Sequence, residues 1–100
     1  MRTMLKVSFP VETGNRVIKD GSLPKLVESF SKRFKPEAAY FFPEAGKRNM
    51  LFVFDMPDTT DMPSVAEPFF MGLDAEISMT PVMNIDDLGT GLEKLMKSRK

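Results

Sequence analysis

Five side chains of this sequence have the chemistry of a site for a small ligand or a proton transfer. Lys6, Asp55 and Glu76 supply an amine and two carboxylates, Tyr40 is the only tyrosine, and Arg16 adds a guanidinium. A partly buried lysine near two carboxylates suits acid–base chemistry, and tyrosine or arginine can hold an oxyanion or a carboxylate. The alternative, which we prefer, is a hydrogen-bonded polar network at a dimer interface, with Lys6 paired to Glu76 or Asp55.

Histidine and cysteine are both absent from the 100 residues, and this excludes several kinds of site. Serine–histidine and cysteine–histidine catalysis, ordinary haem ligation and metal sites built from these residues are ruled out. Asp86 and Asp87 are acidic neighbours, but acidic residues at the start of a helix are expected from the helix dipole alone. We therefore expect neither a metal nor an organic cofactor.

Composition also limits the location and the partners of the protein. The 14 basic and 14 acidic residues are well mixed, so the chain lacks the concentrated positive charge that binding to nucleic acids or anionic membranes requires. It has no apolar run near the roughly 20 residues of a membrane span, and its first residues lack the apolar core of a signal peptide. Because there is no cysteine for disulfides, we expect a cytoplasmic protein without a nucleic-acid or membrane partner.

Alternation and helical spacing predict the elements that would position the five side chains. Four strands are expected over residues 3–9, 37–43, 48–56 and 75–82, and three helices over residues 22–35, from 61 onward, and over about 85–97. Pro68 should kink the second helix or end it early. Residues 11–21, which include Arg16, are expected to form a long loop with two glycines.

This order, β-α-β-β-α-β plus a C-terminal helix, predicts one α+β domain over residues 1–100. It is the split βαβ pattern of the ferredoxin-like fold, with a four-stranded antiparallel sheet. Right-handed crossovers place the two main helices on one face of that sheet. The opposite face is then bare in a monomer.

The third predicted strand indicates what covers the bare face. Residues 50–56 read Met-Leu-Phe-Val-Phe-Asp-Met and are apolar on nearly both faces, and residues 38–42 are similar. A sheet face left in water should instead alternate polar and apolar residues. A chain of this length has little left to cover a second apolar face, so we expect a sheet-on-sheet homodimer.

Strand register decides which side chains share a face. A hairpin around residues 45–46 pairs Tyr40 with Leu51, and a central register places Leu5 by Phe54 and Lys6 by Val53. One face is then wholly apolar, and the other mixes apolar groups with the polar ones: Met4, Lys6, Ser8, Tyr40, Phe42, Asn49, Leu51, Val53, Asp55, Glu76, Ser78 and Thr80. A slip of one residue would reverse every assignment.

Three segments resemble the dimeric α+β barrel superfamily: residues 4–10, residues 53–57 and residues 68–71. The end of the third strand, Phe-Asp-Met-Pro, is similar to that of muconolactone isomerase-like proteins, which tend to carry a histidine where this chain has Lys6. The resemblance covers about residues 3–82. It implies two sheets packed across a dimer, ligands between sheet and helices, and often catalysis of small cyclic or aromatic substrates without a cofactor.

Two functions are therefore expected from this sequence. The first is a homodimer that binds a small hydrophobic or anionic molecule without catalysis, because no reactive group is diagnostic of chemistry. The alternative is a cofactor-independent isomerase or monooxygenase-like enzyme acting on a small cyclic or aromatic acid. In that case Lys6 or Glu76 would move a proton, and Tyr40 or Arg16 would hold the negative charge.

Overall fold

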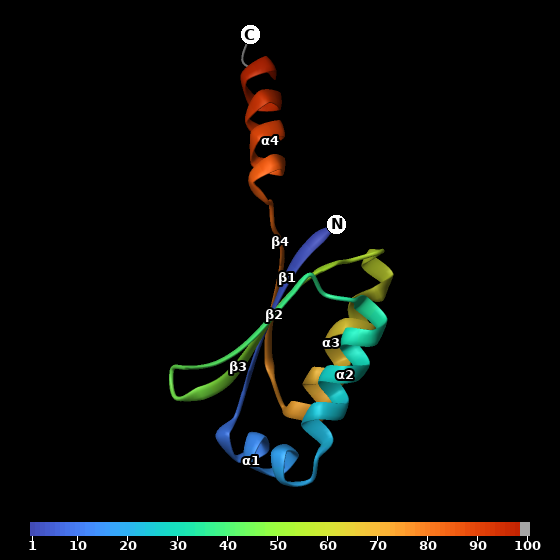
Figure 1. The fold of residues 1–100 in the computed structure, drawn as a ribbon, viewed down its shortest axis with the longest axis vertical. Helices are drawn as coiled ribbons and strands as arrows, with labels where there is room; N and C mark the ends of the chain where they lie inside the picture. Colours follow the sequence, from blue (N-terminus) through green and yellow to red (C-terminus); the bar gives the residue numbers. More distant parts are fainter. Residues whose placement is uncertain (99–100) are drawn as a thin grey trace.

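Four strands form one antiparallel sheet in the computed structural model, which describes residues 1–98 (Figure 1). The strands are β1 (Arg2–Phe9), β2 (Ala38–Glu44), β3 (Lys47–Asp55) and β4 (Glu76–Pro81), and their spatial order is β2-β3-β1-β4. Each βαβ unit has a strand of the other unit between its own two strands, as in the ferredoxin-like fold. Strand β3 lies between β1 and β2, and β1 lies between β3 and β4. The predicted α+β architecture is confirmed.

The helices lie on one side of the sheet and at its two ends. They are α1 (Val11–Lys19), α2 (Ser22–Phe34), α3 (Met62–Leu73), which follows a short 3₁₀ turn (Thr59–Asp61), and α4 (Ile85–Ser98). Figure 1 shows α2 and α3 beside one face of the sheet, with α1 below it and α4 extending beyond the opposite end. We call the face under α2 and α3 the covered face, and the other the open face.

Aromatic packing between α2, α3 and β3 forms the centre of the core. The Phe30 ring lies 4.7 Å from that of Phe52, 5.4 Å from that of Phe54 and 5.6 Å from that of Phe69, measured between centroids. The covered face is wholly apolar in its centre, where it buries Leu5, Val7, Phe9, Met50, Phe52 and Phe54. Since a buried aromatic side chain contributes several kcal/mol, this layer holds the fold together.

The predicted loop over residues 11–21 is wrong, because residues 11–19 form α1. Thr13, Gly14 and Val17 are buried on one side of this helix. Gly14 lies next to Phe9 and the Arg48 side chain, and the Thr13 hydroxyl donates to Asp74 Oδ2 at 2.8 Å. Arg48 also donates to the Val11 carbonyl oxygen at 3.4 Å and to Asn15 Oδ1 at 3.0 Å. Tertiary packing therefore overrides the weak helix propensity of the sequence Thr-Gly-Asn.

Pro68 does not end its helix, because α3 continues through it to Leu73. The predicted hairpin is confirmed: Tyr40 pairs with Leu51, and the two turn residues Ala45 and Gly46 both have a left-handed backbone, with φ of 54° and 75°. Turns of this kind match the twist of the strands that they join.

The register between β1 and β3 differs from the predicted one by two residues. Leu5 pairs with Phe52 and Lys6 with Leu51, rather than with Phe54 and Val53. Because side chains alternate with a period of two, a shift of two residues keeps every side chain on its predicted face. The predicted division of residues between the two faces is therefore retained.

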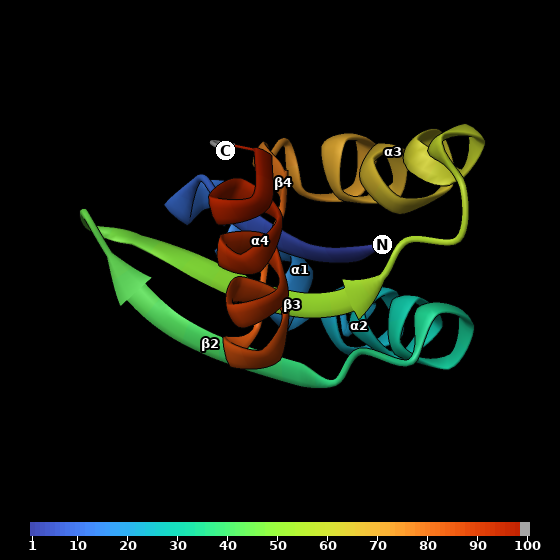
Figure 2. The same cartoon turned by 90° about the horizontal axis from the view of Figure 1, so that it is seen from above.

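The last helix, α4, stands away from the rest of the chain (Figures 1 and 2). None of its described residues is buried. The radius of gyration is 16.2 Å, whereas a compact domain of this length has about 13 Å. None of the helices in residues 1–98 combines the length and the hydropathy needed to cross a bilayer.

Candidate functional site

The open face of the sheet divides into an apolar half and a polar half. Strand pairing fixes this division, since Lys6 lies between Leu51 on β3 and Ser78 on β4, and Tyr40 lies on the far side of Leu51. The apolar half comprises Met4, Ala38, Tyr40, Phe42, Leu51 and Val53. The polar half comprises Lys6, Ser8, Asn49, Glu76, Ser78 and Thr80. The two halves adjoin along β1 and β3.

A depression of about 450 Å³ lies in the polar half, and we call it the polar basin. Its polar lining consists of Lys6, Ser8, Glu44, Lys47, Asn49, Glu76 and Ser78. Strands β1, β3 and β4 supply most of these residues, and Glu44 ends β2 just before the hairpin turn. The volume lies within the range typical of small-molecule sites.

Two ion pairs cross the polar basin. Lys6 Nζ pairs with Glu44 Oε1, and Lys47 Nζ lies 3.9 Å from Glu76 Oε1. About a third of the Lys6 side chain and about half of the Glu44 side chain are exposed. Pairs that are this exposed contribute little to stability, so an incoming carboxylate can replace Glu44 on Lys6 at small cost.

Asn49 fixes the backbone of the hairpin beside the basin. Its side chain is buried, and its Nδ2 donates to the carbonyl oxygens of Glu44 and Lys47 at 3.2 and 3.0 Å. A buried amide that bridges both strands in this way holds the two ends of the turn in register. The ammonium of Lys47 and the carboxylate of Glu44 are thereby presented from a defined backbone.

Two of the five predicted site residues line the basin together, namely Lys6 and Glu76. They do not pair with each other, because Lys6 binds Glu44 and Glu76 lies near Lys47. Tyr40 is in the same cross-strand row as Lys6, with Leu51 between them, and 64% of it is exposed. It borders the basin's apolar side without lining it.

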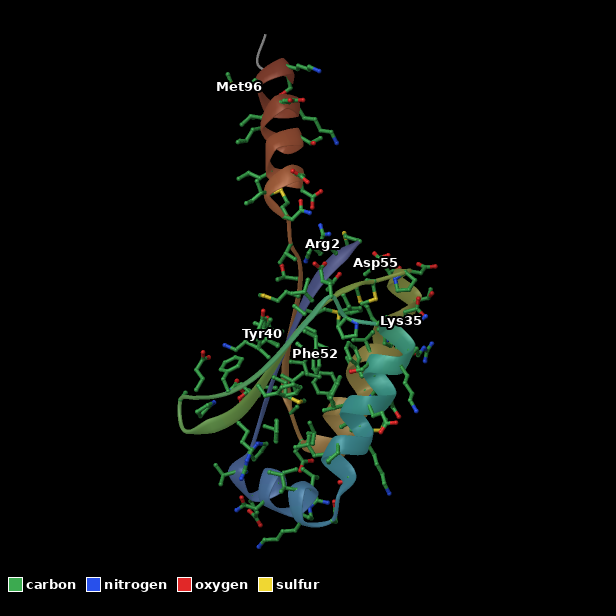
Figure 3. The ribbon with its side chains drawn as sticks, in the orientation of Figure 1. Arg2, Lys35, Tyr40, Phe52, Asp55 and Met96 are labelled. Carbon is green, nitrogen blue, oxygen red and sulfur yellow. The ribbon has the colours of Figure 1, made fainter. Side chains whose placement is uncertain are left out.

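The other two predicted residues, Asp55 and Arg16, lie away from the basin. Asp55 is at the opposite end of the sheet, where its Oδ1 accepts from the Met1 nitrogen at 2.5 Å (Figure 3). Arg16 is on α1, and its Nη2 lies 4.0 Å from Asp74 Oδ2. The side chains with acid–base chemistry are therefore spread over three places.

Two basin residues, Glu44 and Lys47, were missed by sequence reasoning. The sequence could have predicted Glu44, because the alternation that places Tyr40 and Phe42 on the open face also places Glu44 there. Glu44 pairs directly with Lys47 across the turn. The charges flanking a hairpin turn were therefore better markers of the basin than the lone tyrosine.

A second depression, of about 140 Å³, lies between α2 and α3, but it is too small for most organic ligands. It is lined chiefly by Leu26, Phe30, Phe34, Pro68 and Phe69, with Arg33 among its polar residues. The Arg33 guanidinium lies 5.1 Å from the centre of the Phe34 ring. This depression is a gap between two packed helices rather than a built site.

Arg2 joins the first strand to α4 at the far end of the open face. Its Nε donates to Glu37 Oε1 at 2.6 Å and its Nη1 to Asp87 Oδ2 at 2.9 Å. Glu37, and to a smaller extent Asp87, raise the pKa of Arg2 above its ordinary value. These pairs are structural contacts, because both carboxylates are already engaged by the one guanidinium.

Within residues 1–98, no group of three or more acidic residues converges in the way that a metal ion requires. Comparison with known proteins finds no family model and no curated protein that matches the chain. The polar basin, with two lysines, two carboxylates and two serine hydroxyls, is the arrangement best suited to bind a polar ligand. Its lysines offer charge-assisted hydrogen bonds to a carboxylate.

Proposed function

We propose that the protein is a cytoplasmic homodimer that binds a small anion with an apolar part and does not transform it. The observation that carries this proposal is the position of the polar basin beside apolar side chains on the open face. A carboxylate would bind Lys6 in place of Glu44, and its apolar part would lie toward Leu51 and Tyr40. The absence of cysteine from the sequence supports a reducing compartment.

Dimerisation is proposed because the open face leaves apolar groups in water. Met4, Leu51 and Val53 are only half-buried, although they lie in the central strands β1 and β3. The chain exposes 6,840 Å² in all, whereas a compact monomer of its mass exposes about 5,700 Å². The surplus of about 1,100 Å² exceeds the roughly 800 Å² that each partner buries in a typical interface.

The alternative is the cofactor-independent enzyme, an isomerase or a monooxygenase-like protein acting on a small cyclic or aromatic acid. Lys6 and Glu76 line the same basin, which favours this alternative over any arrangement that uses Asp55 or Arg16. It requires that a bound ligand be converted. Binding without conversion is the simpler proposal, because both lysines of the basin already face a carboxylate.

The proposal is tested by titrating benzoate and hexanoate, two small apolar carboxylates, into ¹⁵N-labelled protein. We expect saturable shifts of the amide signals of Lys6, Ser8, Lys47 and Ser78. The variant Lys6→Met should weaken binding by about 10- to 100-fold, because a charge-assisted hydrogen bond is lost. Lys25→Met, which removes an exposed lysine from α2, is the matched control and should leave binding unchanged.

The same samples distinguish binding from catalysis. If both carboxylates leave the spectrum of the basin unchanged at millimolar concentration, this ligand class is rejected. If equal losses of affinity follow Lys6→Met and Lys25→Met, the basin is not the site. New ligand signals that appear on incubation with the wild type, and not with Lys6→Met, would support the enzyme instead.

A further inference from the structure

The helix α4 carries a broad apolar surface, and none of its described residues is buried. Ile85, Leu88, Leu92 and Leu95 follow one another at spacings of three, four and three residues, so they lie on one side of the helix. All four are exposed, and Ile85 reaches 87%. A helix of this length is marginal alone in water, so such a stripe normally packs against another surface.

Two glycines widen this stripe. On a helix of 3.6 residues per turn, Gly89 and Gly91 flank the leucines, and the charged residues Asp86, Asp87, Glu93, Lys94 and Lys97 occupy the opposite side. A side chain at Gly89 would meet nothing within 4 Å, and one at Gly91 would only touch Met83. No neighbouring atom among residues 1–98 of the same chain therefore requires a glycine at either position, although each glycine lowers helix stability. Their use is explained if another surface approaches the helix closely.

The width of the uncharged side favours a sheet rather than a second helix as that surface. In a two-helix coiled coil the positions beside the apolar seam normally carry charges, whereas here they are Gly89, Gly91 and Met96. The 14 residues of α4 also provide only two heptads, which is fewer than a stable coiled coil uses. A flat apolar surface fits the stripe better.

The apolar half of the open face has the required shape and chemistry. It is uncovered, and its six residues lie on three adjacent strands (Met4, Ala38, Tyr40, Phe42, Leu51 and Val53). The helix is about 21 Å long, and the nine residues of β3 span about 30 Å, so α4 fits along the sheet without overhang. Glycines on the helix would let its backbone approach the pleated surface.

The helix extends beyond the end of its own sheet (Figure 1). Asn84 and Asp87 cap its first turn reciprocally: Asp87 N donates to Asn84 Oδ1 at 2.8 Å, and Asn84 N donates to Asp87 Oδ2 at 3.1 Å. The guanidinium of Arg2, the first residue of β1, donates to the same Asp87 carboxylate. Val82 N donates to the Arg2 carbonyl oxygen at 3.1 Å. Only two residues lie between that bond and the helix.

We infer that α4 of one protomer packs its apolar side onto the apolar half of the open face of a second copy of this chain. The inference rests on the proposed homodimer and states which segment makes the contact. By two-fold symmetry each chain gives one helix and receives one, so both unpartnered surfaces are buried. The polar basin remains at the edge of the contact, where the partner's helix would form one wall.

Light scattering and sedimentation of the full chain test whether α4 is needed for the dimer. The double variant Leu88→Gln/Leu92→Gln should raise the dimer dissociation constant by about 100-fold or more, because two buried leucines are lost from each helix. Both residues are exposed in the single chain, so the variant should fold as the wild type does. Met71→Gln, at an exposed apolar residue of α3, is the matched control and should leave the constant unchanged.

Cross-linking between two single variants identifies the contact, because the natural chain has no cysteine. A mixture of Leu92→Cys and Leu51→Cys chains should form a covalent heterodimer on mild oxidation. Each variant alone should form far less covalent dimer. Rapid homodimer formation by Leu51→Cys alone would instead indicate two sheets face to face and would overturn the inference.

The remaining outcomes separate this inference from the proposed function. A wild-type dimer that Leu88→Gln/Leu92→Gln leaves intact would overturn the role of α4 and leave the homodimer standing. A wild-type chain that is monomeric at 100 μM or above would overturn both. A monomer in which a Leu51→Cys/Leu92→Cys double variant forms an internal disulfide would show that α4 folds onto its own sheet.

Discussion

The covered face and the open face are built from alternate residues of the same four strands, yet they bury their apolar side chains to different extents. Phe52 and Leu51 are neighbours on β3, and Phe52 is fully buried under α2 and α3, whereas Leu51 is only half-buried. Apolar residues buried on the covered face, such as Phe52, stabilise the monomer. Apolar residues on the open face, such as Leu51, contribute less to the fold of one chain, so their presence on a central strand indicates association.

The largest expected effect is a difference in stability between variants of Phe52 and variants of Leu51. Phe52→Ala should lower the free energy of unfolding by about 3–5 kcal/mol, because it opens a cavity among the rings of Phe30 and Phe69. Leu51→Ala should lower it by only about 1 kcal/mol. Urea denaturation, at a concentration where the chain is monomeric, measures both. Equal losses would mean that the two faces do not differ as the structure indicates.

The second prediction concerns association rather than stability. Leu51→Lys places a charge in the middle of the apolar half of the open face, and it should weaken a dimer by about 100-fold or more. The free energy of unfolding of the monomer should change by less than about 1 kcal/mol, because the introduced lysine side chain can reach water. Sedimentation equilibrium and urea denaturation give the two numbers. A dimer that survives Leu51→Lys would exclude this surface from the interface.

A smaller effect is expected at the hairpin that ends β2 and begins β3. Ala45 has a left-handed backbone, which asparagine adopts more readily than alanine. Ala45→Asn should therefore stabilise the monomer by about 0.5–1 kcal/mol, measured by thermal unfolding. Gly46→Ala is the opposite control, and it should destabilise the chain because Gly46 has a φ of 75°.

The smallest expected effect lies far from both faces, in the connection between α1 and α2. The backbone N–H and the hydroxyl of Ser22 both donate to Asp20 Oδ1, and these bonds lower the pKa of Asp20. These bonds therefore stabilise the folded chain at a pH above the pKa that Asp20 has in the unfolded chain. This stabilisation is lost as the pH falls through the lower pKa that Asp20 has in the folded chain. Asp20→Asn should slightly lower the melting temperature at pH 7, and this difference should shrink as the pH falls below the ordinary pKa of an aspartate.

Strand alternation predicted both faces of the sheet correctly, even where the register was wrong. The pairing of Lys6 with Leu51 instead of Val53 moved residues along the strand but not through the sheet. The helix α1 could not be predicted in this way. Its helical conformation depends on the burial of Gly14 and Val17. Gly14 lies against Phe9 and Arg48, and only the finished fold brings these residues together.

The candidate site was predictable only in part, for a similar reason. The sequence indicates which face a side chain occupies, but not how far apart two residues lie along that face. Lys6 and Glu76 share the polar basin, whereas Asp55 lies at the other end of β3. The carboxylate that binds Lys6 belongs to Glu44, on a strand that is not adjacent to β1.

The bonds of Asp87 have a mechanical consequence. One carboxylate sets the direction of α4, because it accepts from the Asn84 backbone and from the Arg2 guanidinium. A helix about 21 Å long acts as a lever, so a tilt of about 10° at its base displaces its tip by about 4 Å. Substitutions at this joint, on the charged side of α4, would change the angle at which two chains meet. Where the new angle no longer lets two chains exchange helices reciprocally, each helix would dock on a further copy, and an open chain of subunits would form.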